Sequence, residues 1–299
     1  MSRIFLHIGL PKTATTTLQT DIFPYLNEGN IKYVGVRQPR SAEQNPLYKI
    51  IYGAIRNGEN IKVVRNEIIT ILKSDMSLLL SEEMIVVSEP QVNWHVKLKN
   101  LSNLVYGLDY TLIVTVREPV SAMFSYYVEL YSQCSKEKKS FEELALRDQR
   151  MEIFHYEKFF HVISSLFDIS QVFVKKFEEV IVGDVVDLYR LFGVQDKMEN
   201  IASISKHNSK KSANGYVYTK KKLNISCVMR NLLSRTGIAD FYFINALKKN
   251  VRPLMATLDN LSIGVTKMAK PSDKEFEDLR LHMKKETAAI DRLFGIKYE

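Results

Sequence analysis

The sequence predicts a three-layer α/β fold, in which helices flank a central parallel sheet. Short β-type runs alternate with stretches of helical periodicity from residue 3 to residue 194, which is the pattern of a parallel sheet. One run, Thr111–Val116, shows no alternation of polar and apolar residues, as expected of a strand buried on both faces. The 299 residues, 45% of them hydrophobic, suffice for a large core. We expect one domain over residues 1–299, with a mainly helical part at 220–299.

The first elements can be placed from residue type and spacing. Arg3–Ile8 is predicted to be a strand, and apolar residues then recur every four positions, which predicts a helix from Thr15 to about Leu26. A second short strand is expected at Ile31–Val36. The polar composition after it makes 37–60 one of the two weakest candidates for regular structure.

The later elements follow the same rules. Pro119 favours the start of a helix, and Gly193 favours the end of one. In chain order we expect a helix at 61–72, an apolar run at 77–80, a helix at 96–108, a strand at 110–116, a helix from 119, a helix at 154–167, a strand at 171–176 and a helix at 185–192. The other weak candidate is 203–220.

Composition excludes several classes of protein. Two cysteines, Cys134 and Cys227, cannot form the framework of a disulfide-rich secreted protein, and no cluster has metal-site spacing. No apolar run approaches the roughly 20 residues of a membrane span. The N-terminus leads directly into the first predicted strand, so we expect no signal peptide. We therefore expect a cytoplasmic protein that has no transmembrane segment and binds no metal.

The charge is uneven along the chain. The net charge is +8, and the segment Ile204–Leu223 holds six lysines and no acid. Such a segment is either a solvated loop or an anion-binding edge. The excess of positive charge also permits a polyanion-binding module, but the basic residues are not interleaved with aromatic residues in a nucleic-acid-binding pattern, and we expect no nucleic-acid partner.

The strongest chemical signal lies between the first strand and the first helix. A loop that enters a helix N-terminus offers backbone N–H groups and a favourable dipole to an anion. The loop comprises Pro11, Lys12, Thr13, Ala14, Thr15, Thr16 and Thr17. Because Pro11 stands where a Walker A loop needs glycine, and no Walker B aspartate is evident, a magnesium-dependent nucleotide kinase is the less favoured alternative.

A second signal follows the buried strand. Arg117 comes directly after it, and Ser125 lies about two turns into the next helix. Ligands of open α/β sheets bind beyond the carboxyl ends of strands, so Arg117 is expected at the same edge as Lys12. A guanidinium and a hydroxyl so placed could share one phosphate.

The two segments together resemble the sulfotransferases that use 3′-phosphoadenosine 5′-phosphosulfate (PAPS). Two sets of residues match the family pattern. The sequence departs from that pattern at two positions, where Ala14 replaces a glycine and Ala122 replaces an arginine. The first set is Lys12, Thr15, Thr16 and Leu18, and the second is Arg117, Pro119, Ser125 and Tyr127. A softer match covers Val174–Glu178. The resemblance spans roughly residues 3–194.

The resemblance implies a P-loop-like fold and transfer of a sulfuryl group to a hydroxyl or amine, with a carbohydrate or glycolipid as the expected acceptor. It implies that Lys12 stabilises the leaving phosphate, that the loop 11–17 holds the 5′ side of the donor and that Arg117 and Ser125 hold the 3′-phosphate. It also implies that the lysine-rich segment closes over the donor. Lys206, Asn208, Lys210 and Lys211 are the candidates for this contact, and Lys210 is our choice. The sequence gives neither the acceptor's identity nor the oligomeric state.

A hydroxyl acceptor needs a general base. Glu83 is our first choice, because it follows an apolar run and so can lie at the carboxyl end of a strand, near the donor. Its segment also resembles the Ser-x-Glu segment of bacterial members. Glu82, Glu89 and His95 are the alternatives.

Overall fold

The structure is a computed structural model that describes residues 2–28, 30–134, 139–194, 212–213, 216–220 and 265–298. The chain divides into two compact units. The first comprises residues 1–126, 140–209 and 273–299, and the second comprises residues 127–139 and 210–272.

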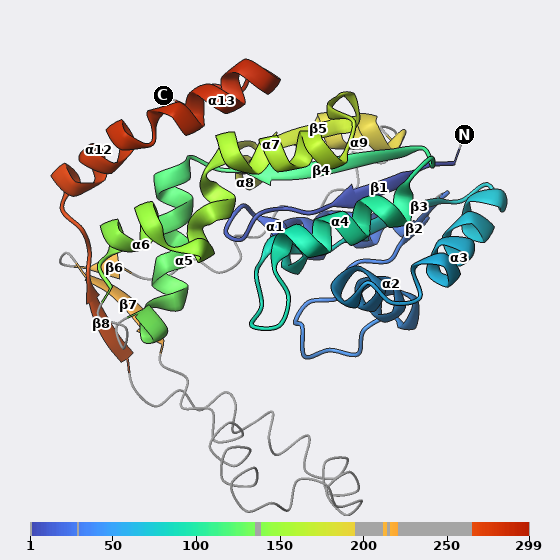
Figure 1. The fold of residues 1–299 in the computed structure, drawn as a ribbon, viewed down its shortest axis with the longest axis horizontal. Coiled ribbons are helices and arrows are strands. Elements are labelled where there is room, and N and C mark those ends of the chain that lie inside the picture. Colours follow the sequence, from blue (N-terminus) through green and yellow to red (C-terminus); the bar gives the residue numbers. More distant parts are fainter. Residues whose placement is uncertain are drawn as a thin grey trace, which may run out of the picture. The chain divides into compact units, whose positions relative to one another are not determined.

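The first unit is built on a parallel sheet of five strands, in the order β2-β3-β1-β4-β5 (Figure 1). The central strand β1 pairs in parallel with β3 on one side and with β4 on the other. This sheet confirms the predicted α/β fold with a central parallel sheet flanked by helices. The strands are β1 Ile4–His7, β2 Ile31–Tyr33, β3 Ser77–Ser81, β4 Tyr110–Val116 and β5 Val172–Lys176.

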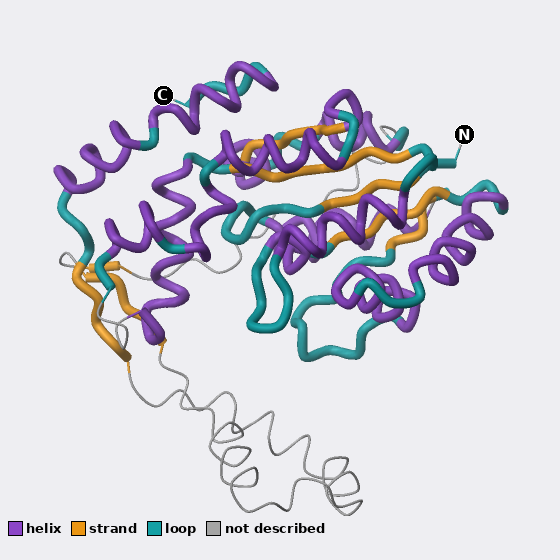
Figure 2. The backbone as a smooth tube through the Cα atoms, viewed as in Figure 1, coloured by secondary structure: helices purple, strands orange, loops and turns teal. Residues whose placement is uncertain are grey.

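Helices and strands alternate along most of the first unit (Figure 2). Helices α4 and α7 lie in front of the sheet in Figure 1, and α9 lies behind it. The α-helices that begin in this unit are α1 Thr15–Thr17, α2 Pro46–Asn57, α3 Ile61–Lys73, α4 Trp94–Val105, α5 Pro119–Cys134, α6 Phe141–Arg147, α7 Tyr156–Leu166, α8 Phe177–Val182, α9 Val186–Phe192, α12 Asp273–His282 and α13 Lys284–Phe294. Short 3-10 helices are η3 Glu83–Val86, η4 Gln149–Phe154 and η5 Ile169–Gln171.

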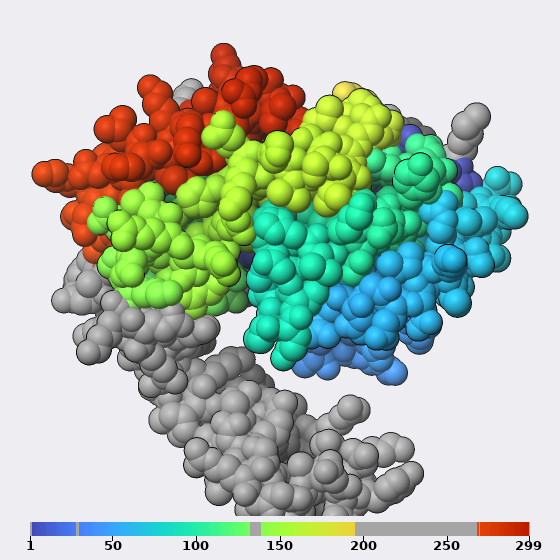
Figure 3. Space-filling model, viewed as in Figure 1, coloured from blue at the N-terminus to red at the C-terminus, as the bar shows by residue number. Residues whose placement is uncertain are grey.

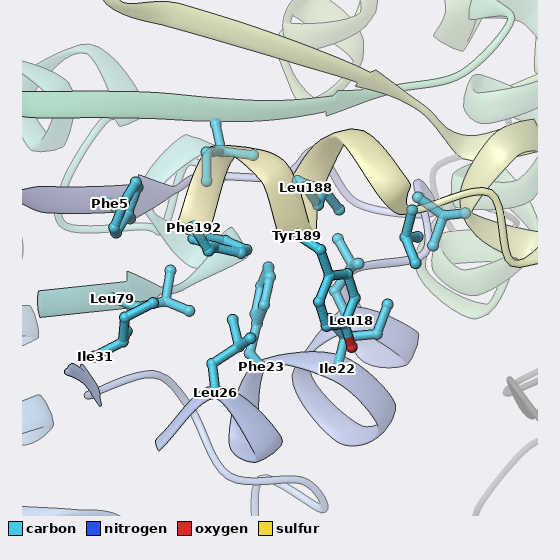
Figure 4. Close-up of a cluster of buried hydrophobic side chains, with 13 residues drawn as sticks. Phe5, Leu18, Ile22, Phe23, Leu26, Ile31, Leu79, Leu188, Tyr189 and Phe192 are labelled. Carbon is cyan, nitrogen blue, oxygen red and sulfur yellow. The ribbon is translucent and has the colours of Figure 1, made fainter. Parts of the chain in front are cut away.

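A hydrophobic core joins α9 to the sheet and to the helical segment that follows β1 (Figure 4). Phe192 meets Phe5 of β1 edge to face, with ring centroids 4.9 Å apart, and Phe23 packs against the same Phe192 ring. This core fixes the end of β1 and the helical segment after it, and hence the loop between them.

That helical segment is less regular than predicted. Instead of one α-helix it contains α1, the π-helix η1 Leu18–Ile22 and the 3-10 helix η2 Phe23–Glu28. Pro24 accounts for part of the difference, because proline has no N–H to donate and its ring clashes with the preceding turn of an α-helix.

The expectation of weak structure at 37–60 was wrong for its second half, which forms α2. The side chain of Asn45 caps this helix by accepting a hydrogen bond from the Leu47 N–H at 2.9 Å, and Pro46 occupies its first position. Ile51 and Ile55 are buried one turn apart. Residues 37–45 form an irregular loop, as predicted.

The second unit contains an antiparallel sheet of three strands, in the order β6-β7-β8. These are β6 Ser212–Ala213, β7 Tyr216–Lys220 and β8 Val265–Ala269. Within the predicted helical part, 220–299, residues 265–269 are therefore a strand, whereas α12 and α13 are helices of the first unit, with α13 packed along α7 (Figure 3). Residues 221–264 lie outside the described residues. Among the described helices, none is long and apolar enough to cross a membrane.

Candidate functional site

The loop after β1 is fastened to the neighbouring strand β4. The Leu10 N–H donates to the Thr115 carbonyl oxygen at 3.4 Å, and the Thr13 hydroxyl lies 2.7 Å from that of Thr115. Thr13 is fully buried and also donates to the Leu10 carbonyl oxygen at 2.5 Å. The hydroxyl of Thr13 thus has a structural role and is not directed to solvent.

Two close constraints shape the loop's path. A Cβ atom on Gly9 would lie 2.3 Å from Thr115 Oγ1 and 2.5 Å from Thr15 Cγ2, so only glycine fits between these buried side chains. Lys12 and Ala14 both have left-handed backbones, with φ of 68° and 67°. A non-glycine residue in this region costs about 1–3 kcal/mol.

Burial alternates along the loop. Pro11, Thr13, Thr15 and Thr17 are buried, whereas Lys12, Ala14 and Thr16 are partly exposed. Ala14 stands immediately before α1 and has no side chain that could cap it. The partly exposed edge therefore presents the Lys12 side chain, the Thr16 hydroxyl and backbone around Ala14.

Arg117 meets this loop from the end of β4. Its Nη1 lies 3.5 Å from the Lys12 carbonyl oxygen, and its guanidinium carbon lies 4.2 Å above the centre of the Phe177 ring, at the start of α8. Burial lowers the pKa of Arg117, and the nearby carboxylates of Glu178 and Glu118 oppose that effect.

The backbone of Arg117 is held as firmly as its side chain. The hydroxyl of Tyr156 accepts a hydrogen bond from the Arg117 N–H at 3.2 Å and donates one to its carbonyl oxygen at 2.5 Å. Tyr156 is fully buried at the start of α7. No sequence signal had indicated this anchor, because an aromatic residue in an amphipathic helix ordinarily packs in the core.

Glu83 meets the same loop from the other side, at the end of β3. Its Oε2 accepts a hydrogen bond from the Thr15 hydroxyl, and Arg40 Nη2 lies 3.0 Å from its Oε1. The Glu83 side chain is 20% exposed, so the carboxylate lies at the boundary between the protein and solvent.

Glu82, by contrast, is completely buried. Its carboxylate accepts hydrogen bonds from both terminal nitrogens of Arg40, at 2.7 and 3.1 Å, and from the Tyr48 hydroxyl. It also caps η3 by accepting from the Met84 N–H at 2.7 Å. These contacts give Glu82 a structural role.

The other two candidate bases contact residues outside the loop after β1. Glu89 lies 3.1 Å from both Arg56 and the buried Lys97, and these cations lower the pKa of Glu89 although burial alone would raise it. The His95 ring lies 3.8 Å from the Trp94 ring, and burial lowers the pKa of His95.

Other predicted residues are distributed as follows. Ser125 lies on α5 and is partly exposed. Lys210 and the rest of its group, Lys206, Asn208 and Lys211, lie outside the described residues. Arg40, which contacts both acidic candidates, was missed, since it comes from an irregular loop without a recognisable pattern.

A cleft of about 690 Å³ lies near Arg117, beyond the ends of β4 and β5. Its charged lining is mixed. The basic residues are Lys176, Arg280 and Lys297, and the acidic residues are Glu118, Glu178 and Glu179. Among the described residues, no group of three or more histidine, cysteine or acidic side chains could hold a metal ion.

Comparison with known proteins gives little further information. No family model matches the chain, and no curated protein matches its sequence. One similar solved structure is a sulfotransferase from Alicyclobacillus acidocaldarius, with 17% sequence identity, a TM-score of 0.42 and coverage of 70% of this chain and 87% of that chain. A likeness at this level says nothing about function.

Proposed function

We propose that this protein is a PAPS-dependent sulfotransferase. The observation that carries the proposal is that one loop contacts both of the other candidate segments. Through Thr15 the loop after β1 reaches Glu83, and through Lys12 it reaches Arg117. A cationic loop, a guanidinium and a carboxylate therefore meet at the carboxyl edge of β1, β3 and β4, where open α/β sheets bind ligands.

The loop is suited to an anionic donor. Gly9 lets backbone and side chains approach where a Cβ would collide, and the partly exposed edge offers Lys12 and the Thr16 hydroxyl. In this proposal residues 11–17 bind the 5′-phosphosulfate, and Arg117 and Ser125 bind the 3′-phosphate. We also propose that Lys210 contacts the bound PAPS. No metal is needed, because Lys12 and Arg117 supply the positive charge.

The proposed reaction is a single in-line displacement. An acceptor hydroxyl oxygen forms a bond to sulfur while the bond from sulfur to the phosphate oxygen breaks. Glu83 takes the hydroxyl proton, and Lys12 with the loop amides stabilises the negative charge on the departing 3′,5′-bisphosphate. The acceptor we propose is a hydroxyl of a carbohydrate or glycolipid, which needs such a base because it is a weak nucleophile.

Calorimetric titration with adenosine 3′,5′-bisphosphate, the spent donor, tests this function. We expect micromolar affinity without metal, and much weaker binding of 5′-AMP, which lacks the 3′-phosphate. Binding of ATP–magnesium alone would favour a nucleotide kinase. Salt-sensitive binding of any polyanion, without preference for the bisphosphate, would favour a binding module. Either result would overturn the proposal.

A further inference from the structure

We propose that Arg40 is a positioning residue for the carboxylate of Glu83. The inference rests on the proposed function, in which Glu83 is the base. Arg40 Nη2 lies 2.7 Å from Glu82 Oε1 and 3.0 Å from Glu83 Oε1, so one nitrogen joins two adjacent carboxylates. One of these carboxylates is buried and the other is at the proposed site.

The buried carboxylate gives Arg40 a fixed support. Glu82 Oε2 accepts from Arg40 Nη1 at 3.1 Å, which makes the pair bidentate. Glu82 is in turn fixed by the Tyr48 hydroxyl and the Met84 N–H. A planar guanidinium held by two parallel hydrogen bonds has a defined orientation. Arg40 therefore contacts Glu83 from a fixed orientation.

The loop that carries Arg40 is also held. The Gln44 side chain accepts from the Arg37 N–H at 2.7 Å and donates to the Arg37 carbonyl oxygen at 2.9 Å. Gln38 Nε2 donates to Gln19 Oε1 at 2.8 Å, which ties this loop to the helical segment after β1. Arg40 is thus placed by a braced loop, although that loop has no regular secondary structure.

The opposite side of Glu83 is held by Thr15, whose hydroxyl has a single proton to donate. If the Thr15 hydroxyl donates its hydrogen bond to bound PAPS, it can no longer donate one to Glu83. Arg40 then keeps the carboxylate in place through the chemical step. The effect of Arg40 is consequently expected on kcat and not on donor affinity.

The test compares Arg40→Ala with Arg40→Lys and the unchanged protein. We expect kcat of Arg40→Ala to fall by about 10²-fold, the size of loss caused by a 1 Å misplacement of a reacting group, while the bisphosphate Kd changes less than about threefold. Because the Arg40 side chain is 37% exposed, millimolar methylguanidinium should reach the site and restore part of kcat. Arg40→Lys should retain more activity than Arg40→Ala.

Removal of Arg40 also leaves the buried Glu82 carboxylate without its counter-ion, and this alone could unfold the protein. The double variant Arg40→Ala with Glu82→Gln removes that buried charge, and Glu82→Gln alone is its control. We expect the double variant to fold and to show the same loss and rescue. Glu82→Gln alone, whose amide oxygen can still accept a hydrogen bond from Arg40, should lower kcat much less than the double variant does.

Failure of the role proposed for Arg40 and failure of the proposed function would give different results. An unchanged kcat in the double variant, or a loss without rescue by methylguanidinium, would overturn the role of Arg40. The role of Glu83 as the base is tested separately, by the loss of kcat in Glu83→Gln. Failure of the unchanged protein to bind the bisphosphate would overturn the proposed function, and the role of Arg40 with it.

Discussion

The hydroxyl of Thr15 donates a hydrogen bond to the carboxylate of Glu83, although the two residues are far apart in sequence. The contact follows from the sheet, in which β1 and β3 are parallel neighbours and His7 lies opposite Ser81. Residues that follow the two strands must meet at one edge. The loop after β1 thereby acquires a carboxylate partner, and this is the arrangement on which the proposed chemistry depends.

The adjacent carboxylates Glu82 and Glu83 should differ sharply on substitution. Glu83→Gln should lower kcat by about 10²–10⁴-fold, the usual contribution of a general base. Glu82→Gln should lower kcat far less than Glu83→Gln, but it should lower the free energy of unfolding, since it weakens a buried pair with Arg40. Steady-state kinetics and urea unfolding of both variants check this. Equal losses of kcat would contradict the assignment.

Ala14→Gly should stabilise the protein. Ala14 has a φ of 67°, a conformation that glycine adopts without the cost an alanine bears. We expect the free energy of unfolding to rise by about 1 kcal/mol. The control is Ala54→Gly within α2, which should lower it by about 1 kcal/mol. Destabilisation by Ala14→Gly, measured by urea unfolding, would mean that the loop is not left-handed at this position.

Thr13→Val should weaken the attachment of the loop to β4. The variant keeps the shape of the side chain but loses the hydroxyl that bonds the Leu10 carbonyl oxygen and Thr115. A buried group left without a partner costs about 1–3 kcal/mol. Thr13→Ser, which keeps the hydroxyl, is the matched control. Urea unfolding of the two variants measures the difference, and equal stability would exclude a role for this hydroxyl.

Stability should fall in acid partly through Glu286. Burial alone would raise the pKa of this carboxyl, but hydrogen bonds from His155 and the Glu157 N–H outweigh burial, and the net pKa is lowered from 4.5. A carboxyl whose pKa is lower in the folded than in the unfolded state stabilises the folded state at every pH above about 4.5. This stabilisation is lost as the pH falls through the folded-state pKa.

The measurement is urea unfolding of the unchanged protein and Glu286→Gln between pH 3 and pH 7. The difference in stability between the two should be largest above about pH 4.5 and shrink below it. A constant difference across the range would show that ionisation of Glu286 does not contribute.

Much of the sheet could be predicted because its strands are short apolar runs between helical segments. Tyr110–Val116 is an example, and the structure gives the same bounds. The helix α2 was missed although Asn45, Pro46 and the buried Ile51 and Ile55 were visible in the sequence. The polar residues before Pro46 obscured that pattern.

The candidate site was harder to predict in full. Lys12, Glu83 and Arg117 could be placed at one edge because each follows a strand of a parallel sheet. Arg40 and Tyr156 could not, since their contacts depend on how distant segments pack. The positive φ of Ala14 was also hidden, because nothing in an alanine indicates a left-handed backbone.

The most direct test of the central claim compares Arg117→Ala with Arg65→Ala. Arg65 donates a hydrogen bond to the Leu104 carbonyl oxygen on the α3–α4 side of the fold and serves as a matched control. The measurement is the ratio of affinities for adenosine 3′,5′-bisphosphate and 5′-AMP, by calorimetry. We predict that the unchanged protein and Arg65→Ala strongly prefer the bisphosphate, and that Arg117→Ala loses this preference while remaining folded. A preference that survives in Arg117→Ala would contradict the placement of the 3′-phosphate beside the loop after β1.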